Sequence, residues 1–323
     1  MRLRLVPDET NFDFFRWQKV TFGASVIAVI VSILLWLIVG LNFGIDFQGG
    51  TSIRTEATQV IDDGEYRRAV EALDLGEVTV TQVFDPTFRD DQHVALIRIQ
   101  TQEGEEAVTA DVTQQVLGAL QKIDPSVSFT SVDSVGPKVS GELVLGAVLA
   151  VLAALVAILI YIWLRFEWQF SVGAVAALFH DVIVTIGIFS LFQIRFDLAT
   201  IAALLTIVGY SINDTVVIFD RLRENLRKFK TTPLVEVMNR TVNETLSRTL
   251  MTSGTTLIAL LALLIFGGDV IRGFVFAITW GVIVGTYSSV YVAKNIVLML
   301  GVKRDWSKPT DGGPGTQFAN VDA

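Results

Sequence analysis

Apolar residues along this chain gather into six long stretches, at about residues 20–41, 143–164, 170–192, 198–219, 250–267 and 273–298. At 1.5 Å of rise per residue, each stretch reaches about the 30 Å thickness of a hydrocarbon core when helical. The first is too long for the core of a signal peptide and lacks an Ala-x-Ala cleavage pattern, so it is expected to remain as a span. The pattern therefore predicts a polytopic α-helical membrane protein with six transmembrane helices.

Between the first two spans the apolar spacing changes to alternating strand and helix periods. Strands are expected at residues 51–56, 78–84, 93–100 and 127–135, and helices at 64–73 and 105–121. Pro86 and Pro125 interrupt the pattern between elements. The order βαββαβ predicts a small α+β ferredoxin-like domain at residues 42–138, outside the cytoplasm.

Basic residues predict the orientation of the spans. Arg16 and Lys19 precede the first span, and residues 220–249 carry seven Lys or Arg residues between two later spans. Such residues favour the cytoplasmic side, which predicts a multi-pass protein of the cytoplasmic (inner) membrane with both termini inside. The chain is expected to begin with a cytoplasmic N-terminus at 1–19 and a first helix at 20–41, followed by the extracytoplasmic domain at 42–138. The remaining helices are expected at 139–302, with a cytoplasmic segment at 220–249, and the chain is expected to end in a disordered tail at 303–323.

Composition supports this division into two parts. Hydrophobic residues make up 51% of the chain and mean hydropathy is +0.54, as in membrane proteins. Residues 42–138 carry 17 acidic and 7 basic residues, whereas the whole chain has a net charge of −8. An acidic external domain argues against nucleic acid as a partner. Cysteine is absent, which excludes disulfides and thiol chemistry.

Ionisable residues inside the predicted spans are the strongest functional signal. A carboxylate at the centre of a span costs roughly 2.5–3.5 kcal/mol to insert and usually serves function. Asp214 lies in the fourth apolar stretch, Asp181 in the third, and Arg248 directly before the fifth. These three residues predict a proton or ion path. Asp181 either extends that path or only bonds a neighbouring helix.

Polar side chains accompany these charges at helical spacing. Two facing stripes are expected on the fourth and fifth spans, formed by Thr206, Tyr210, Asn213 and Asp214, and by Arg248, Thr252, Thr255 and Thr256. The long guanidinium of Arg248 is expected to reach in and pair with Asp214. The hydroxyl groups have an alternative role as hydrogen-bonding contacts between helices.

Glycine-rich segments connect the external domain to the spans. Gly44, Asp46, Gly49 and Gly50 follow the first span, and Gly136-Pro137 precedes the second. Glycine allows positive φ and sharp turns, so these residues predict a hinge.

Signatures of enzymes and metal sites are absent from the sequence. The chain has no phosphate-binding P-loop and no HExxH, GxSxG or GxGD motif. His93 has no neighbours at metal-ligand spacing and is expected to be an ordinary residue at the start of a strand. The protein is therefore expected not to be an enzyme, to use no cofactor or metal, and to draw energy from an ion gradient or a partner.

Five short segments together resemble the SecD/SecF family of protein-export membrane proteins, in the RND superfamily. They are listed in chain order: FGIDFQGGT at 43–51, VGPKVSGEL at 135–143, His180-Asp181, GYSINDTVVIFDR at 209–221 and TLSRTLMTSGTT at 245–256. The small external domain resembles the SecF type, because SecD-type members have a far larger one.

The resemblance implies a function in protein export. It implies a six-span half-unit that joins SecD, works with the SecYEG channel, YajC and translocating preproteins, and uses the proton motive force in late steps of translocation. Asp214 and Arg248 match the positions implicated in proton conduction. An RND-type half-transporter for small molecules or lipids, and a scaffold that only stabilises SecD, are the alternatives.

Overall fold

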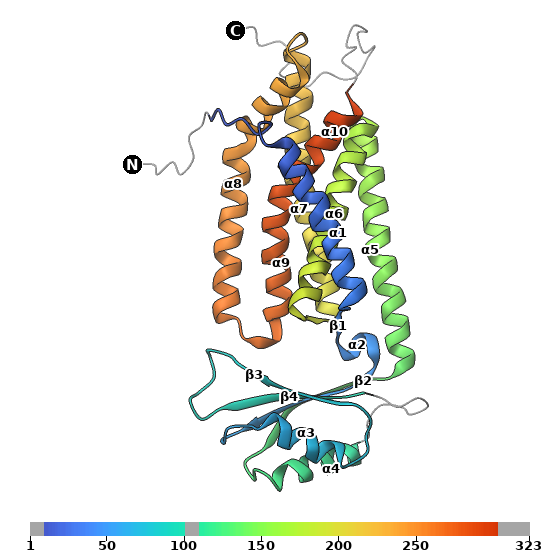
Figure 1. The fold of residues 1–323 in the computed structure, drawn as a ribbon, viewed down its shortest axis with the longest axis vertical. Coiled ribbons are helices and arrows are strands. Elements are labelled where there is room, and N and C mark those ends of the chain that lie inside the picture. Colours follow the sequence, from blue (N-terminus) through green and yellow to red (C-terminus); the bar gives the residue numbers. More distant parts are fainter. Residues whose placement is uncertain (1–9, 101–109, 303–323) are drawn as a thin grey trace, which may run out of the picture.

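A computed structural model describes residues 10–100 and 110–302. A bundle of long helices and a small α/β domain lie end to end, and the first and last described residues lie at the end of the bundle away from that domain (Figure 1). The expected tail at 303–323 and the expected helix start at 105–109 lie outside the described residues.

Six helical segments in the described part of the chain are long and apolar enough to cross a membrane, which confirms the predicted fold class. They are α1 (Gln18–Ile38), α5 (Pro137–Arg165), α6 (Trp168–Phe192), α7 (Leu198–Lys228), α8 (Leu234–Phe266) and a last segment of α9 (Asp269–Ser288), η1 (Ser289–Ala293) and α10 (Lys294–Leu300).

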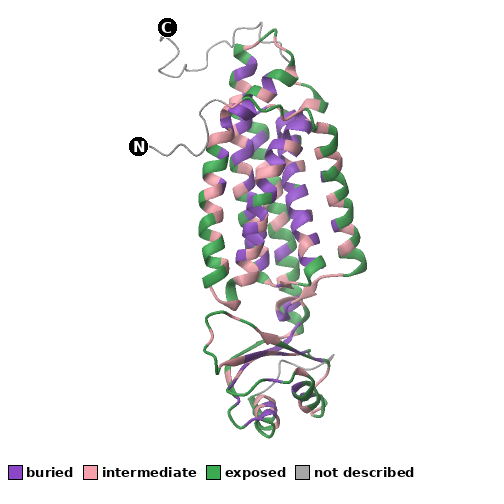
Figure 2. Ribbon diagram, turned by 60° about the vertical axis from the view of Figure 1, so that its left-hand side comes forward, coloured by how far each residue is buried: buried purple, intermediate pink, exposed green. Residues whose placement is uncertain are grey.

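The six segments divide into central and peripheral helices. Buried residues make up 56% of the most apolar part of α6 and 44% of the corresponding parts of α7 and of the last segment. The share is 11% for α1 and α8 and 0% for α5, so buried residues follow the middle of the bundle (Figure 2). The described residues therefore enclose α6, α7 and the last segment more completely than α1, α5 and α8.

The fourth and fifth spans continue well beyond their apolar stretches. α7 runs to Lys228 and α8 begins directly after Pro233, so residues 220–249 form the ends of two long helices. Buried apolar residues continue along both ends and pack together; they are Leu222, Leu226, Val237, Met238 and Val242. Hydropathy alone stopped the predicted spans too early because charged residues share these turns.

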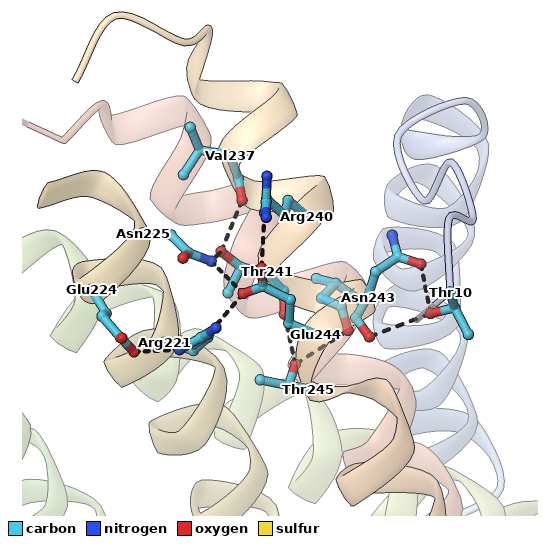
Figure 3. A network of polar contacts seen from close by, with 11 residues as sticks. Thr10, Arg221, Glu224, Asn225, Val237, Arg240, Thr241, Asn243, Glu244 and Thr245 are labelled. Atoms are coloured by element: carbon cyan, nitrogen blue, oxygen red, sulfur yellow. Dashed lines mark hydrogen bonds and ion pairs between the residues drawn. The ribbon is translucent and has the colours of Figure 1, made fainter. Parts of the chain in front are cut away.

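A half-buried carboxylate joins these two helix ends. Glu244 on α8 accepts hydrogen bonds from Arg221 Nε at 2.7 Å, Asn225 Nδ2 at 2.7 Å and Arg240 Nε at 2.8 Å (Figure 3). Two of these donors come from α7, and both arginines are charged, which strengthens the bonds. Arg221 thus helps to hold α7 against α8.

The last span contains a π-helical turn at Ser289–Ala293 between α9 and α10. A π turn accommodates an extra residue in a continuous helix and leaves no mark in the hydropathy pattern. The sequence predicted one uninterrupted span here for that reason.

The external domain has the predicted βαββαβ order. Its elements are β2 (Gly50–Ala57), α3 (Asp63–Glu71), β3 (Val78–Val83), β4 (His93–Ile99), α4 (Ala110–Gln121) and β5 (Ser128–Val135). The strands pair antiparallel in the order β3-β4-β2-β5, so each helix connects strands that are not neighbours. Both helices cover the face of the sheet turned away from the bundle (Figure 1). This is the ferredoxin-like arrangement, and His93 begins β4 as expected.

The core of this domain lies between the sheet and its helices. Ile53, Ile97, Val70 and Leu120 are fully buried there. Tyr66 of α3 is also buried, and burial, with Asp124 adding to it, raises its pKa to about 12. The phenol therefore stays neutral and behaves as a core side chain.

Polar contacts fasten the external domain to the bundle at the start of α9. Arg272 donates to the carbonyl of Phe84 at 2.7 Å and pairs with Asp85 at 3.6 Å, and Arg54 of β2 pairs with Asp269 at 3.8 Å. Hydrogen bonds from Thr87, with the charge of Arg272 adding to them, hold the pKa of Asp85 below its ordinary value. A cavity of about 1130 Å³ separates much of the sheet from the bundle.

Candidate functional site

Two carboxylates lie inside the helical bundle. Asp181 on α6 is 0% exposed and Asp214 on α7 is 5% exposed. Both belong to helices whose other buried residues are mostly apolar or small. A charge in such a position requires compensation or marks a pathway.

Asp181 connects three central helices. Its Oδ2 accepts hydrogen bonds from Ser211 Oγ of α7 at 2.6 Å and Ser288 Oγ of α9 at 2.8 Å. Its Oδ1 lies 2.9 Å from Nδ1 of His180 on the same helix. Three donors on one carboxylate compensate an ionised Asp181, and a proton arriving there must rearrange at least one of these bonds.

The close approach of α7 and α9 explains how two serines reach Asp181. A Cβ at Gly281 would overlap the side chain of Ile207, and one at Gly285 would lie 3.0 Å from the Cβ of Ser211. Only glycine permits this separation of the helices. The close packing at Gly281 and Gly285 thus brings Ser211 and Ser288 to the same carboxylate.

Asp214 is less well compensated than Asp181. Its Oδ2 is buried and has no hydrogen-bond partner within the described residues. Arg248 and Ser253 of α8 are the groups that act on it, and Ser253 lies 2.7 Å from Thr286 of α9 through their hydroxyl oxygens. Asp214 follows Ser211 by three residues, so it lies about one helical turn further along α7 than the serine that bonds Asp181.

The predicted ion pair between Asp214 and Arg248 is not formed. No contact within 4.0 Å joins the two side chains in the described chain, and Arg248 is exposed on the peripheral helix α8. The effect of Arg248 on Asp214 acts through space.

The two predicted polar stripes meet at one point. Tyr210 donates to Thr256 Oγ1 at 3.4 Å, across α7 and α8. The hydroxyls of Thr206, Thr252 and Thr255 bond carbonyls of their own helices instead. Thr206, Asn213, Thr255 and Arg248 are exposed in this chain. A polar face at the depth of the membrane requires protein or water beside it, not lipid.

Three residues of the site were not identified in the sequence. Ser211 and Ser288 bond Asp181, and Ser253 of α8 is one of the groups that act on Asp214. Serine is neutral and common in membrane helices, so the only available signal was the three-residue spacing between Ser211 and Asp214. No group of three or more potential metal-ligating side chains occurs in the described parts of the chain.

The expected hinge residues form a compact junction. Gly44 begins the short helix α2 (Ile45–Gln48) and donates its N–H to the carbonyl of Phe196 at 2.8 Å, and Asp46 Oδ2 accepts from the N–H of Leu198, the first residue of α7. On the second connection, Gly136 caps α5 and Pro137 occupies its first turn.

A small parallel pairing that the sequence did not predict lies beside this junction. β1 (Asn42–Phe43) pairs with β6 (Arg195–Phe196), which joins the end of the first span to the start of the fourth. Strands of two residues have too little periodicity to be recognised.

Glycine at position 50 is required by the backbone, and we expect Gly50→Ala to be strongly destabilising. Gly50 has φ of +118°, and a Cβ there would overlap the carbonyl oxygen of Ile99. Forcing an L-residue into this region costs about 1–2 kcal/mol before the overlap is counted. The melting temperature of the purified protein should fall clearly. Gly136→Ala is the matched control, because nothing lies within 4 Å of a Cβ there and φ is −72°; equal melting of both variants would contradict the argument.

The fold and the site together define a class: a six-span helical membrane protein with a ferredoxin-like external domain after its first span and ionisable groups in its central helices. Comparisons with known proteins agree. The family model "Protein export membrane protein SecD/SecF, C-terminal" matches residues 115–303, and the "SecD/SecF GG Motif" matches residues 35–59. The chain belongs to the SecD/SecF family of protein-export membrane proteins.

Individual relatives cover the whole chain. It is 65% identical to the protein translocase subunit SecF of Cereibacter sphaeroides, with 100% of this chain and 99% of the relative covered. It is 62% identical to the corresponding protein of Rhodobacter capsulatus, with 96% of each covered.

Longer relatives contain a second part. The chain is 41% identical to the protein translocase subunit SecDF of Brucella abortus, covering 97% of this chain but 40% of the relative. It is also similar to the crystal structure of SecDF, a translocon-associated membrane protein from Thermus thermophilus, with a TM-score of 0.82 and 36% identity over 93% of this chain and 40% of that one. The matched part is thus less than half of each SecDF chain.

Proposed function

We propose that this protein is a non-enzymatic accessory subunit of the Sec protein-export machinery that couples the proton motive force to late steps of translocation, together with SecD. The observation that carries the proposal is the pair of buried carboxylates on α6 and α7. One oxygen of Asp214 has no hydrogen-bond partner among the residues that the structure describes. A carboxylate that is enclosed but incompletely compensated can gain and lose a proton, whereas a purely structural one is usually fully bonded.

The exposed polar residues on α7 and α8 support SecD as the partner. Thr206, Asn213, Thr255 and Arg248 would face lipid if this chain stood alone. In the SecDF relatives, a second part of the same polypeptide accompanies the part that matches this chain. We infer that SecD covers this polar face, so that Asp214 lies close to the contact between the two subunits. The SecYEG channel, YajC and translocating preproteins are the further partners that this role requires.

Export measured in membrane vesicles tests the proposed function. Vesicles without this subunit should keep ATP-driven translocation and lose the part that depends on a proton gradient, and the subunit should copurify with SecD. Transport of a small molecule or lipid without any export defect would instead support an RND-type half-transporter. Identical gradient dependence with and without the subunit would refute proton coupling.

We also propose that both termini and the ends of α7 and α8 lie in the cytoplasm. Arg221, Arg240 and their basic neighbours lie at the end of the bundle away from the acidic external domain, as the positive-inside rule requires. Reporter fusions after residues 90 and 235 should therefore report opposite sides of the membrane. The same side for both would refute this topology.

A further inference from the structure

Lys294 is a buried basic residue that lies outside the site around Asp181 and Asp214. It is the first residue of α10, directly after the π-helical turn, and is 2% exposed. Its Nζ has no hydrogen-bond partner within the described residues. A lysine near the end of a span normally extends its ammonium group to the water interface. Lys294 does not, although a Met of similar length would avoid the cost of burying a charge.

Aromatic rings surround this ammonium group. Nζ lies 3.8 Å from the ring centroid of Phe15 and 5.7 Å from those of Phe14 and Tyr291. Cation–π attraction of this kind is strongest where water is excluded. Two of the three rings belong to the segment before α1, so the charge of Lys294 attracts a part of the chain remote in sequence.

That segment, residues 10–15, is the N-terminal strap. It lies against α8, where Phe12 N donates to Asn243 Oδ1 at 2.8 Å and Phe14 N donates to Asn239 Oδ1 at 2.9 Å. The amide nitrogens of Asn239 and Asn243 donate back to the carbonyl of Phe12 at 3.0 and 2.9 Å. Thr10 also bonds Asn243 (Figure 3). The strap thus joins α8 to Lys294 at the start of α10.

A line of ring contacts connects this cage to Asp181. His180, which bonds Asp181, has its ring centroid 6.3 Å from that of Tyr287. Tyr287 lies 5.1 Å from Tyr291 by the same measure, and Tyr291 lies 6.3 Å from Phe14. A second connection runs along the backbone, since Ser288 bonds Asp181 and the π turn follows at once. Such turns often occur at functional sites.

We propose that Lys294 is a positioning residue of the coupling core: it latches the N-terminal strap across α8 and α10, and a change in the charge of Asp181 loosens that latch through Tyr287, Tyr291 and the π turn. This proposal rests on the proposed proton coupling and says where the bundle changes shape. The loosened element is on the end of the bundle opposite the external domain. The carboxylate that acts on the charge of Lys294 is Asp13, which lies on the strap itself and is exposed.

Hydrogen–deuterium exchange of the strap in the full-length protein tests the latch without any export assay. The amides of Phe12 and Phe14 are protected by Asn243 and Asn239, so they report directly on strap opening. Lys294→Met should speed their exchange by on the order of tenfold, which is the effect of losing a buried cation–π contact. Lys294→Arg keeps the positive charge, so exchange should stay slow in that variant. Phe15→Leu, a change on the strap itself that leaves Lys294 in place, should act like Lys294→Met and remains informative if the latter fails to fold.

Lys228→Met is the matched control, because Lys228 lies 5.6 Å from the ring of Phe229 but is exposed; it should leave exchange of the strap unchanged. Wild-type exchange in both Lys294→Met and Phe15→Leu would overturn the latch. Asp181→Asn removes the charge of the core and should also speed exchange of the strap by several-fold; wild-type exchange in that variant would overturn the link to the core. Neither result depends on export, so a failure here is distinguishable from a failure of the proposed function.

Discussion

Asp214→Asn should abolish the gradient-driven part of export while ATP-driven translocation continues. Asparagine has the size of aspartate but cannot release a proton, so it cannot take part in a relay. The atom that changes, Oδ2, has no hydrogen-bond partner among the described residues, and we therefore expect little loss of stability. A single charge moved through the full potential is worth about 2.3 kcal/mol per 100 mV, which is enough to drive a two-state rearrangement. The measurement is export by vesicles with and without an imposed proton gradient.

Asp220→Asn is the matched control for this experiment. Asp220 lies on the same helix, is exposed, and pairs with Arg165 at 2.9 Å. An exposed ion pair contributes about 0–1 kcal/mol and carries no proton into the bundle, so this variant should export normally. If a stably assembled Asp214→Asn protein retains the gradient-driven component, Asp214 is not a relay and the alternative of a scaffold for SecD remains. Arg248→Met should weaken the same component less severely, because no direct ion pair is lost.

Asp181→Ala should cause the largest loss of stability among the single substitutions of the site. It removes the common acceptor of Ser211 and Ser288 and the partner of His180. Each buried polar group left without a partner costs about 1–3 kcal/mol. The loss affects α6, α7 and α9 together, the helices that contain most of the buried residues. Thermal melting of the purified protein is the measurement.

Smaller changes at the same place separate the effect of charge from that of packing. Ser211→Ala and Ser288→Ala each remove one donor and should lower the melting temperature less than Asp181→Ala does. Asp181→Asn keeps an oxygen that can accept from both serines, and we expect intermediate stability. If Asp181→Ala melts like the wild type, the three-helix network does not stabilise the bundle.

Much of the architecture follows from local sequence pattern. Span length, the turn at Gly267-Gly268-Asp269 and the βαββαβ order each depend on residues that are close together in the chain. The helix that contains the apolar fifth stretch begins directly after Pro233, a residue that favours the start of a helix. Asp181 and Asp214 were also identified locally, because a carboxylate within an apolar stretch is unusual wherever the helix points.

Only the tertiary structure decided which groups meet. The sequence placed Arg248 beside Asp214, but the two form no ion pair in the structure, and the serines that bond Asp181 come from α7 and α9. Glycines at 281 and 285 set that geometry through the close approach of two helices. Lys294 is covered by the N-terminal strap, a contact between two segments that are remote in the chain. Hydropathy and periodicity describe each helix along its own axis, whereas the rotation of a helix and its neighbours depend on side-chain packing between segments that are remote in the chain.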